Sequence, residues 1–411
     1  MMYSLAIHLY ALVVACIAPF HRKARLMRAG QARTLDLLRE RIDRKAKYIW
    51  FHAASLGEFE QGRPLMERIR AEHPEYKILL TFFSPSGYEV RKNYAGADVI
   101  CYLPFDTPDR VHDFLDAAAP VMAFFIKYEF WGNYLETLKE RGIPTYIISA
   151  IFRPDQLFFQ WFGKAYRKML FYFDHLFVQD ERSRQLLAEY GITNVTVAGD
   201  TRFDRVLDIH RAAHDVAEVE AMLQAKTGKE PFTMVAGSTW PEDEEILLPY
   251  FQQHPEMKLV IAPHEIHEAH LKSIESQLKR PYLRLSQAAG KDLAAYDCLI
   301  IDCFGLLSSI YRYGQVAYIG GGFGAGIHNT LEAAVYGIPV LFGPKYHKFK
   351  EAKDLIAAGG GFSIASAAEF TTRMDELLDD DAYRTQSGEA AGTFVSSHAG
   401  ATELIFKHIF S

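Results

Sequence analysis

Several chemistries are excluded by what this 411-residue sequence lacks. Its four cysteines are scattered and form no CxxC pair, which argues against a zinc ribbon or a disulfide scaffold and fits a reducing compartment. The formal net charge of -6 provides no basic footprint for phosphates, so we expect no nucleic-acid partner. No internal repeat or low-complexity segment is visible, and the phosphate-loop motif of kinases does not occur.

The N-terminus departs from this average composition. Residues 2–20 carry no formal charge and are mostly apolar, which is close to the minimum of about 17 to 25 residues for a bilayer span. Basic residues follow this run rather than precede it, so the positive-inside rule places the rest of the chain in the cytoplasm. We therefore expect a membrane anchor over residues 1–21 and attraction of the basic stretch to anionic headgroups. A helix buried against the soluble body, with solvated positive charges after it, is the alternative.

After the N-terminus, short apolar runs alternate with segments of helix length, which is typical of parallel sheets covered on both faces. The pattern runs to residue 205, gives way to a charged helical stretch over 206–230, and restarts at 231. We expect two doubly wound Rossmann-like domains, 22–205 and 231–411, joined by that linker and facing a central cleft. The aromatic stretch 152–173 predicts a helix or helix pair, and residues 402–409 a C-terminal helix of the second domain. Ligands of such sheets bind outside the carboxyl ends of the strands.

The most informative segment is the glycine-rich stretch 317–337, where a strand runs into a turn and then a helix. Glycines let backbone amides approach an anion, and a helix N-terminus favours negative charge. Asn329 is the expected N-cap and Glu332 the expected acceptor for a ribose diol. A dinucleotide fold is the alternative, but it needs an acidic residue after the next strand, where Gly343-Pro344-Lys345 stands.

Four further segments place polar residues directly after predicted strands. Glu58 and Glu129 are candidate acids at the crevice end of the first domain, although an acid at a helix start is often only a dipole partner. Ser238 and Thr239 lie in a turn that suits phosphate or sugar oxygens. His264 begins a histidine series, but without an HExxH motif we expect no metal.

Taken together, these segments resemble the Kdo transferases, which move 3-deoxy-D-manno-oct-2-ulosonic acid (Kdo) from CMP-Kdo onto lipid A precursors. The resemblance covers nearly the whole chain and is carried by an ordered set of segments: Ser-x-Gly-Glu58, Glu129-x-Trp131, Gly-Ser238-Thr239, Gly-Asp-Thr-Arg202-Phe-Asp204, and Gly-Gly followed by His328-Asn329-x-Leu-Glu332. It implies a GT-B fold, inverting transfer without a metal or cofactor, and lipopolysaccharide synthesis at the cytoplasmic face of the inner membrane.

By position, the resemblance makes Glu58 the general base and Glu129 the second essential acid. The substrate-binding residues that we assign are Arg202, Ser238, Thr239, His264, Gly321, Gly322, Gly326, His328, Asn329 and Glu332. Arg202 replaces the family's lysine, and His264-Glu265 replaces an arginine-containing segment, so individual nucleotide contacts stay open. A GT-B enzyme for another donor, such as a UDP-sugar transferase or a nucleotide-sugar epimerase, and a non-catalytic membrane scaffold are the alternatives.

Overall fold

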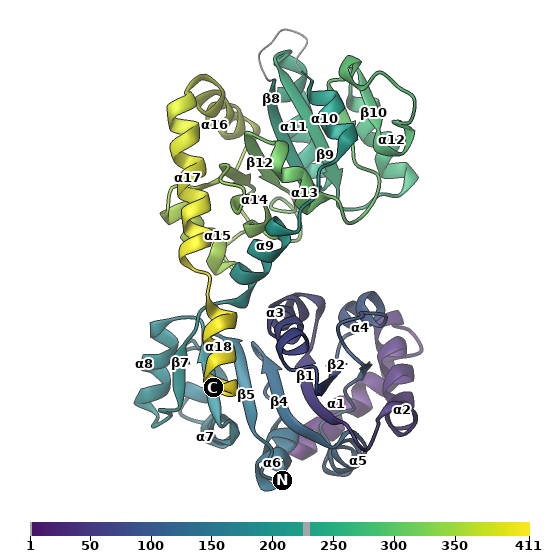
Figure 1. Ribbon diagram of the computed structural model, residues 1–411, viewed down its shortest axis with the longest axis vertical. Helices are drawn as coiled ribbons and strands as arrows, with labels where there is room; N and C mark the ends of the chain where they lie inside the picture. The colour runs from purple at the N-terminus through teal and green to yellow at the C-terminus, as the bar shows by residue number, and fades with distance from the viewer. Residues whose placement is uncertain (1, 225–230) are drawn as a thin grey trace. The chain divides into compact units, whose positions relative to one another are not determined.

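The computed structural model describes residues 2–224 and 231–411, so residues 225–230 of the predicted linker lie outside the described residues. The chain divides into two compact units, one formed by residues 1–205 with 399–411 and the other by residues 206–398. Each unit is an α/β layer structure built on a parallel sheet with helices on its faces (Figure 1).

Within the described residues the sheet of the first unit has seven strands in the order β3-β2-β1-β4-β5-β6-β7, all parallel. Its strands are β1 (Lys47–Ala53), β2 (Tyr76–Phe82), β3 (Val99–Tyr102), β4 (Pro120–Ile126), β5 (Thr145–Ala150), β6 (His175–Val178) and β7 (Val195–Val197). The strand order reverses between β1 and β4. This pair is therefore the switch point where doubly wound sheets bind ligands.

The described part of the second unit holds a parallel sheet of seven strands in the order β10-β11-β9-β8-β12-β13-β14. Its strands are β8 (Phe232–Thr239), β9 (Met257–Pro263), β10 (Tyr282–Arg284), β11 (Cys298–Ile300), β12 (Val316–Ile319), β13 (Val340–Phe342) and β14 (Gly361–Ser363). Here the order reverses between β8 and β12, which makes the ends of these two strands the second switch point.

Helices connect the strands and cover both faces of each sheet. The first unit contains α1 (Met2–Ile17), α2 (Arg22–Arg41), α3 (Leu56–Glu72), α4 (Pro85–Arg91), α5 (Pro108–Ala118), α6 (Gly132–Glu140), α7 (Lys164–Arg167), α8 (Glu181–Glu189) and α18 (Ala401–Phe410). Helix α9 (Thr201–Arg211) crosses the boundary between the units. The second unit contains α10 (Ala217–Leu223), α11 (Pro241–Gln253), α12 (Glu268–Gln277), α13 (Leu307–Ile310), α14 (Leu331–Ala334), α15 (Lys350–Ala357), α16 (Ala367–Asp379) and α17 (Asp381–Ser397).

The central strands are apolar on both sides because both sides are covered. In β1 the side chains of Ile49 and Phe51 enter the core cluster under α3, whereas Tyr48 and Trp50 enter the cluster on the other face. Successive side chains of a strand point to opposite faces, so a strand covered twice reads as one continuous apolar run. This is why the sequence pattern identifies the central strands.

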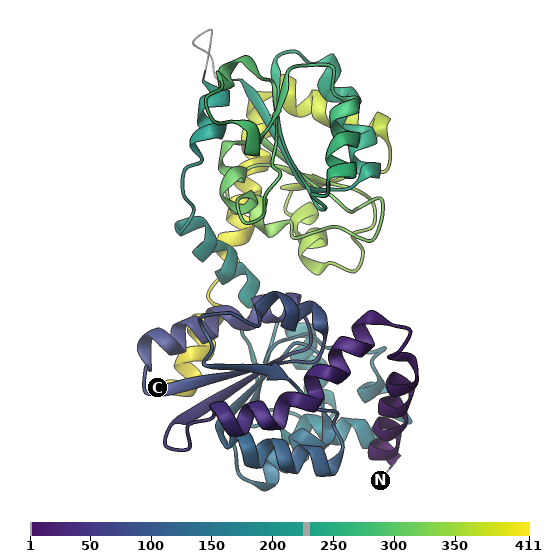
Figure 2. The ribbon, with the colours of Figure 1, turned by 90° about the vertical axis from the view of Figure 1, so that its right-hand side faces the viewer.

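The N-terminal anchor predicted over residues 1–21 is not supported as a single span. Helix α1 covers 16 residues, and among residues 2–224 and 231–411 no single helix is both long and apolar enough to cross a bilayer. The segments Tyr3–Ile17 and Arg22–Arg41 meet that criterion only as a pair bent by 118°. Val14 and Ala18 are buried in a cluster with Tyr102 and Phe105, so one side of this helix packs on the first unit (Figure 2).

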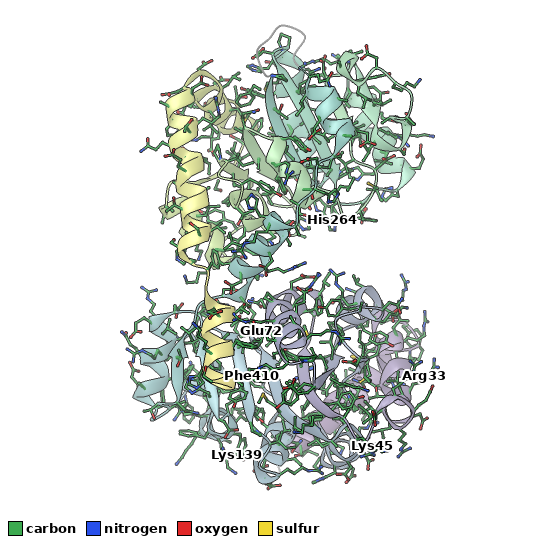
Figure 3. All side chains as sticks on the ribbon, in the orientation of Figure 1. Arg33, Lys45, Glu72, Lys139, His264 and Phe410 are labelled. Carbon is green, nitrogen blue, oxygen red and sulfur yellow. The ribbon has the colours of Figure 1, made fainter. Side chains whose placement is uncertain are left out.

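The C-terminal helix lies elsewhere than expected. The sequence assigns residues 399–411 to the second domain, but α18 packs in the first unit, with Ile405 and Phe406 in the cluster beneath α3. The rings of His73, directly after α3, and Phe410 stack with centroids 4.6 Å apart, and Figure 3 labels Phe410 on α18. Asp204 holds the start of α18, because its carboxylate accepts hydrogen bonds from the amides of Gly400 and Thr402 at 2.6 and 2.7 Å.

The aromatic stretch 152–173 also differs from the prediction. It contains only short helical pieces, the 3₁₀ turns Leu157–Phe159 and Lys168–Tyr172 around α7. Three of its phenylalanines, Phe152, Phe158 and Phe173, pack around the ring of Phe130 with centroids 5.8, 4.7 and 6.2 Å away. Packing around one ring replaces helical periodicity here. Strand β14 is not predicted, because its three residues include no apolar run.

Candidate active site

Glu58 lies in the first turn of α3, directly after β1, one of the two strands that form the first switch point. Its Oε2 accepts hydrogen bonds from the backbone amides of Ala54 at 2.6 Å and Ser55 at 3.2 Å, which hold the half-buried side chain near the end of β1. Burial, followed by the negative charge of Glu129, raises the pKa of Glu58 to about 8, against the opposing effects of the two amides and Lys127. A carboxyl group with a pKa near neutrality is suited to proton transfer.

Glu129 follows β4 and is buried in a hydrogen-bonded network. Its Oε2 accepts from the indole Nε1 of Trp131 at 2.7 Å and lies 3.0 Å from Nε2 of His52. The other ring nitrogen of His52 lies 2.8 Å from the hydroxyl of Thr81, which also accepts from Trp50 at 2.8 Å. In a neutral ring the Nε2 proton points at the carboxylate and Thr81 donates to Nδ1. The network fixes the orientation of Glu129.

The backbone between β4 and Glu129 is strained. Lys127 has a φ of 63°, in the left-handed region that costs a residue with a Cβ about 1 kcal/mol or more. Such strain persists where the surrounding structure imposes it, commonly at functional sites. Here it turns the chain directly after β4 and leads into the segment that carries Glu129.

Glu60, two residues after Glu58, has a different environment. Its carboxylate pairs with Arg91 at 2.7 Å and with Arg205 at 3.3 Å. These contacts engage Glu60 in an ion-pair cluster on the other side of α3, because side chains two residues apart on a helix do not share a face.

The second switch point carries the glycine-rich turn after β12, but part of that turn serves the fold. The amide of Gly321, whose φ is 89°, donates to Oδ2 of Asp243 at 2.8 Å. Asp243 also accepts from the hydroxyl of Tyr318 at 2.8 Å. A Cβ at Gly322 would lie 2.5 Å from the backbone of Gly343, so this position requires glycine for strand packing. The sequence predicts that both glycines bind substrate. Instead, the amide of Gly321 binds Asp243, and the lack of a side chain at Gly322 allows close packing against Gly343.

The same applies to one of the two hydroxyl residues that end β8. Thr239 is fully buried and donates to Glu244 at 2.8 Å, and Nε2 of His270 lies 3.0 Å from the same carboxylate. Ser238 is different: it is half-buried, has a φ of 54°, and its hydroxyl makes no hydrogen bond to any residue in 2–224 or 231–411. Ser238 is therefore the hydroxyl that this turn offers to a ligand.

An aromatic stack forms beside these turns. The indole of Trp240 stacks on His264 with centroids 4.7 Å apart, and His264 lies 4.4 Å from His328. Trp240 Nε1 donates to Nε2 of His328 at 3.3 Å, which leaves Nδ1 of that ring as a donor when it is neutral. Burial, and then the nearby His264, lowers the pKa of His328 to about 4, so the ring is neutral at pH 7.

The remaining predicted residues of this unit lie after the turn. Asn329 is not the N-cap as predicted, because Thr330 takes that position before α14, but Oδ1 of Asn329 accepts from the amide of Leu331 at 3.1 Å. Its Nδ2 donates to Glu332 at 3.0 Å and so orients that carboxylate. Helix α14 has only four residues, so its dipole adds little, and Gly326 supplies a turn with a φ of 121°.

Arg202 belongs to the first unit, at the start of α9. Its guanidinium donates to Oδ2 of the buried Asp200 at 2.8 and 3.0 Å. Although burial opposes it, the charge of Arg202 lowers the pKa of Asp200. Asp200 also accepts from Gln61 at 3.0 Å, so Arg202 is held at the carboxyl edge of the sheet.

The structure therefore brings the predicted residues together in two groups. Glu58, Glu129 and Arg202 share the edge of the first sheet, and the others share the ends of β8, β9 and β12. Sequence reasoning missed the supporting residues His52, Thr81, Asp243, Glu244 and His270. A signal existed for His52, a polar residue at the end of a strongly apolar strand. In the part of the chain that is described, no three His, Cys, Asp or Glu side chains gather in a way that suits a metal ion.

Comparison with known proteins shows what the chain resembles. Residues 24–205 match the family described as 3-deoxy-D-manno-octulosonic-acid transferase (kdotransferase). The chain is 29% identical over 378 residues to the 3-deoxy-D-manno-octulosonic acid transferase of Bordetella pertussis, covering 86% of this chain and 85% of that one. It is 27% identical over 341 residues to the enzyme of the same name from Aquifex aeolicus, covering 80% and 86%. The chain is therefore similar to the transferases of this name, over residues 24–205 in the family comparison and over most of its length in the two relatives.

Solved structures of the same fold extend the comparison. A UDP-GlcNAc 2-epimerase from Neisseria meningitidis superimposes with a TM-score of 0.61 at 14% identity, covering 88% of this chain and 99% of that one. The UDP-GlcNAc 2-epimerase of Methanocaldococcus jannaschii gives 0.54 at 12% identity, covering 86% and 99%. At these identities the likeness concerns the fold, which consists of two parallel-sheet α/β domains.

Proposed function

We propose that this transferase moves Kdo from CMP-Kdo to a lipid A precursor of the lipid IVA type, with inversion and without a metal, in lipopolysaccharide synthesis. The names of its relatives support the sugar. The observation that carries the chemistry is the pair of carboxylates that follow the neighbouring strands β1 and β4 at the first switch point. One of them, Glu58, has a pKa raised to about 8 by burial and by the other.

In the proposed reaction Glu58, in its ionised form, takes the proton of the acceptor hydroxyl as that oxygen bonds to the anomeric carbon of Kdo. The bond between this carbon and the phosphate oxygen of CMP breaks, and its electron pair stays on the phosphate. General-base assistance contributes about a hundred- to ten-thousand-fold. Glu129, held by Trp131 and His52, positions the acceptor and, by its charge, sets the basicity of Glu58.

The second unit is proposed to bind the donor. Three groups at the ends of β8 and β12 support this role: the free hydroxyl of Ser238, the neutral ring of His328, and Glu332 oriented by Asn329. A hydroxyl and an imidazole N–H suit phosphate oxygens, and a carboxylate accepts hydrogen bonds from a ribose diol.

We further propose that α1 and α2 associate with the cytoplasmic face of the inner membrane. Large apolar side chains are exposed along one side of α1: Leu5, Leu9, Leu12, Val13 and Ile17. Seven basic residues and two acidic ones follow in α2. An apolar helix face beside a basic helix suits an anionic membrane surface, where apolar burial and charge attraction add.

The test is incubation of the purified protein with CMP-Kdo and a tetra-acylated lipid A precursor, followed by mass spectrometry of the lipid. We expect a mass increase of one or more Kdo units with CMP-Kdo and none with UDP-sugars. Glu58→Gln is expected to retain CMP-Kdo binding and lose at least a hundredfold in transfer. The matched control Glu60→Gln removes the same charge from the same helix outside the site. Transfer from a UDP-sugar, or no turnover of any donor, would replace the proposal with one of its alternatives.

A further inference from the structure

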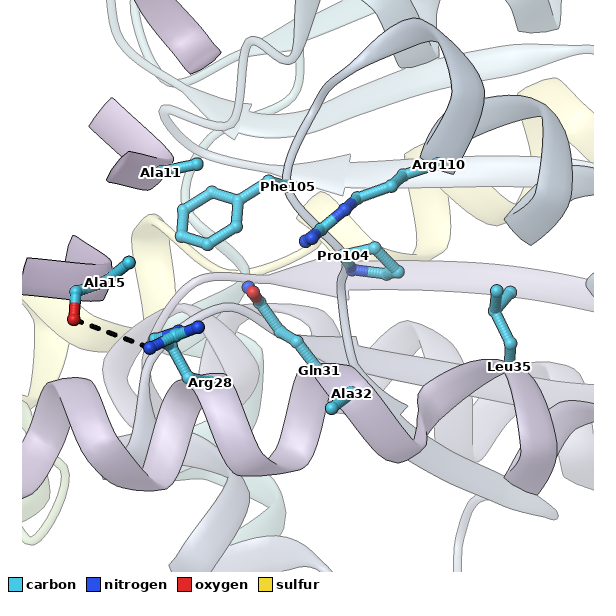
Figure 4. Close-up of a pocket in the computed structure, with 9 residues that line it drawn as sticks. All are labelled: Ala11, Ala15, Arg28, Gln31, Ala32, Leu35, Pro104, Phe105 and Arg110. Carbon is cyan, nitrogen blue, oxygen red and sulfur yellow. Dashed lines mark hydrogen bonds between the residues drawn. The ribbon is translucent and has the colours of Figure 1, made fainter. Parts of the chain in front are cut away.

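A cavity of about 350 Å³ lies between the N-terminal helices and the carboxyl edge of the first sheet (Figure 4). Helices α1 and α2 form two of its walls, and the loop after β3 with the start of α5 forms the third. Its polar groups come from Arg28 and Gln31 on α2 and from Arg110 on α5, and Phe105 lines it from the loop. None of these residues is part of the site described above.

Gln31 carries an unsatisfied hydrogen-bond acceptor in this cavity. Its side chain is buried, with 7% of the residue exposed, and its Nε2 donates to the carbonyl oxygen of Leu103 at 2.8 Å. That bond fixes which end of the amide is nitrogen, because a carbonyl oxygen only accepts. The other end, Oε1, is buried without a hydrogen-bond partner. Figure 4 shows the side chain extending between the guanidinium groups of Arg28 and Arg110. A buried acceptor without a hydrogen bond costs about 1–3 kcal/mol, so the site favours a ligand that supplies a hydrogen-bond donor.

The two arginines bring positive charge to the same cavity without a matching acid. Arg28 donates to the backbone oxygen of Ala15 at 3.4 Å, and Arg110 lies over the ring of Phe105 at 5.9 Å. No salt bridge to either guanidinium occurs among residues 2–224 and 231–411. Arginine is the side chain best suited to phosphate, since its planar fork donates two parallel hydrogen bonds.

We propose that this cavity binds the phosphorylated sugar headgroup of a lipid. The phosphate lies between Arg28 and Arg110, and a sugar hydroxyl or amide N–H donates to Oε1 of Gln31. The acyl chains leave along the exposed apolar side of α1. A bare phosphate at neutral pH offers mainly acceptors and leaves Gln31 unsatisfied, whereas a phosphosugar carries both chemistries. The inference rests on the proposed function for the identity of the lipid, which is the acceptor itself.

A line of aromatic rings joins this cavity to the carboxylates within the same unit. The ring of Phe105 lies 5.8 Å from that of Phe83, which lies 4.6 Å from the ring of Trp131. Trp131 in turn donates to Glu129. The cavity wall and the residue that holds Glu129 therefore belong to one packed aromatic cluster, in which Phe105 is buried. The cavity therefore acts on acceptor binding rather than on bond cleavage.

The test uses the double variant Arg28→Gln with Arg110→Gln in the full-length protein. Both side chains are exposed, so folding is expected to be unchanged by circular dichroism. We expect KM for the bisphosphorylated acceptor to rise at least tenfold, with kcat and the KM of CMP-Kdo within twofold. The matched control is Arg39→Gln, which changes a basic residue of the same helix that pairs with Asp36 and does not line the cavity.

A second measurement separates this inference from the transfer reaction. Without donor, binding is measured to phosphatidylcholine vesicles that contain the phosphorylated glycolipid, its dephosphorylated form, or phosphatidylglycerol. We expect the double variant, and Gln31→Met, to lose at least fivefold in binding to the phosphorylated glycolipid alone. Equal losses on phosphatidylglycerol would assign the arginines to general membrane attraction, and unchanged binding would remove the site. Either result overturns the inference, whereas a selective loss supports it even if Kdo is not transferred.

Discussion

Replacing Glu58 by glutamine is expected to impair transfer and, at alkaline pH, to stabilise the protein. Glutamine keeps the oxygen that accepts from the amides of Ala54 and Ser55, so the first turn of α3 is preserved. It removes the charge that burial and Glu129 disfavour, which are the causes of the raised pKa. A catalytic change that also stabilises the fold is typical of a site under electrostatic strain.

The size and the pH window of this effect follow from the pKa. The folded pKa of about 8 exceeds the ordinary value of 4.5, so the folded state holds the proton between these values while the unfolded state has lost it. Stability of the wild type therefore falls as the pH rises across this window. The full shift corresponds to about 5 kcal/mol, and solvent screening of a half-buried group reduces this to about 2 kcal/mol. For a unit of this size that is about 4–8 °C in Tm.

The assay is thermal unfolding of wild type and Glu58→Gln from pH 4 to pH 9. We expect equal Tm values near pH 4, a growing advantage for the variant above pH 5, and a plateau above pH 8. In the same series, kcat/KM of the wild type is expected to rise up to about pH 8, because only ionised Glu58 accepts a proton. A variant that is less stable at every pH, or an advantage that does not depend on pH, would refute the reasoning.

Three further predictions concern the supports of the two edges. Gly322→Ala places a Cβ 2.5 Å from the backbone of Gly343, so we expect the free energy of unfolding in urea to fall by about 1–3 kcal/mol. The control is Gly324→Ala, whose added Cβ has its nearest neighbours at 3.9 Å or more, and we expect it to change the free energy of unfolding little. Thr81→Val leaves Trp50 Nε1 and one ring nitrogen of His52 without their hydrogen-bond partner, so we expect the free energy of unfolding to fall by about 1–3 kcal/mol and kcat to fall as well. We expect Thr81→Ser to restore both. An unchanged kcat in Thr81→Val would contradict the positioning of Glu129 by this network. His328 has a pKa lowered to about 4 in the folded protein, whereas in the unfolded chain it takes up a proton below pH 6.5. We therefore expect the second unit to lose stability as the pH falls from 6.5 to 4, and to lose less in His328→Gln. Hydrogen exchange of the amides of β12 measures this loss.

The sequence predicts the central strands and the position of the acids for a physical reason. A strand covered on both faces must be apolar over most of its length, as β1 and β4 are, and polar residues directly after such strands must lie at the carboxyl edge. Glu58 and Glu129 therefore come together because β1 and β4 are neighbours. The raised pKa of Glu58 was not predictable, because it depends on burial and on a residue 71 positions away.

Other features depend on contacts that a local pattern does not contain. Hydroxyls and amides of Thr239 and Gly321 look available for a ligand, but Glu244 and Asp243 on α11 use them. The Ser238 hydroxyl differs from that of Thr239 because the backbone at Ser238, with a φ of 54°, turns the side chain away from Glu244. The position of α18 depends on Asp204, whose partner amides lie about 200 residues later in the chain.

That long-range cap has a consequence for biosynthesis. The last helix completes the core cluster of the unit that the ribosome makes first, with Ile405 and Phe406 filling the surface beneath α3. Folding during synthesis is therefore interrupted. The first unit leaves the ribosome with an uncovered apolar patch and with the Asp204 carboxylate lacking its partner amides. It stays in this state until the second unit and the last helix have been synthesised. During that interval the nascent chain carries a surface of the kind that chaperones bind.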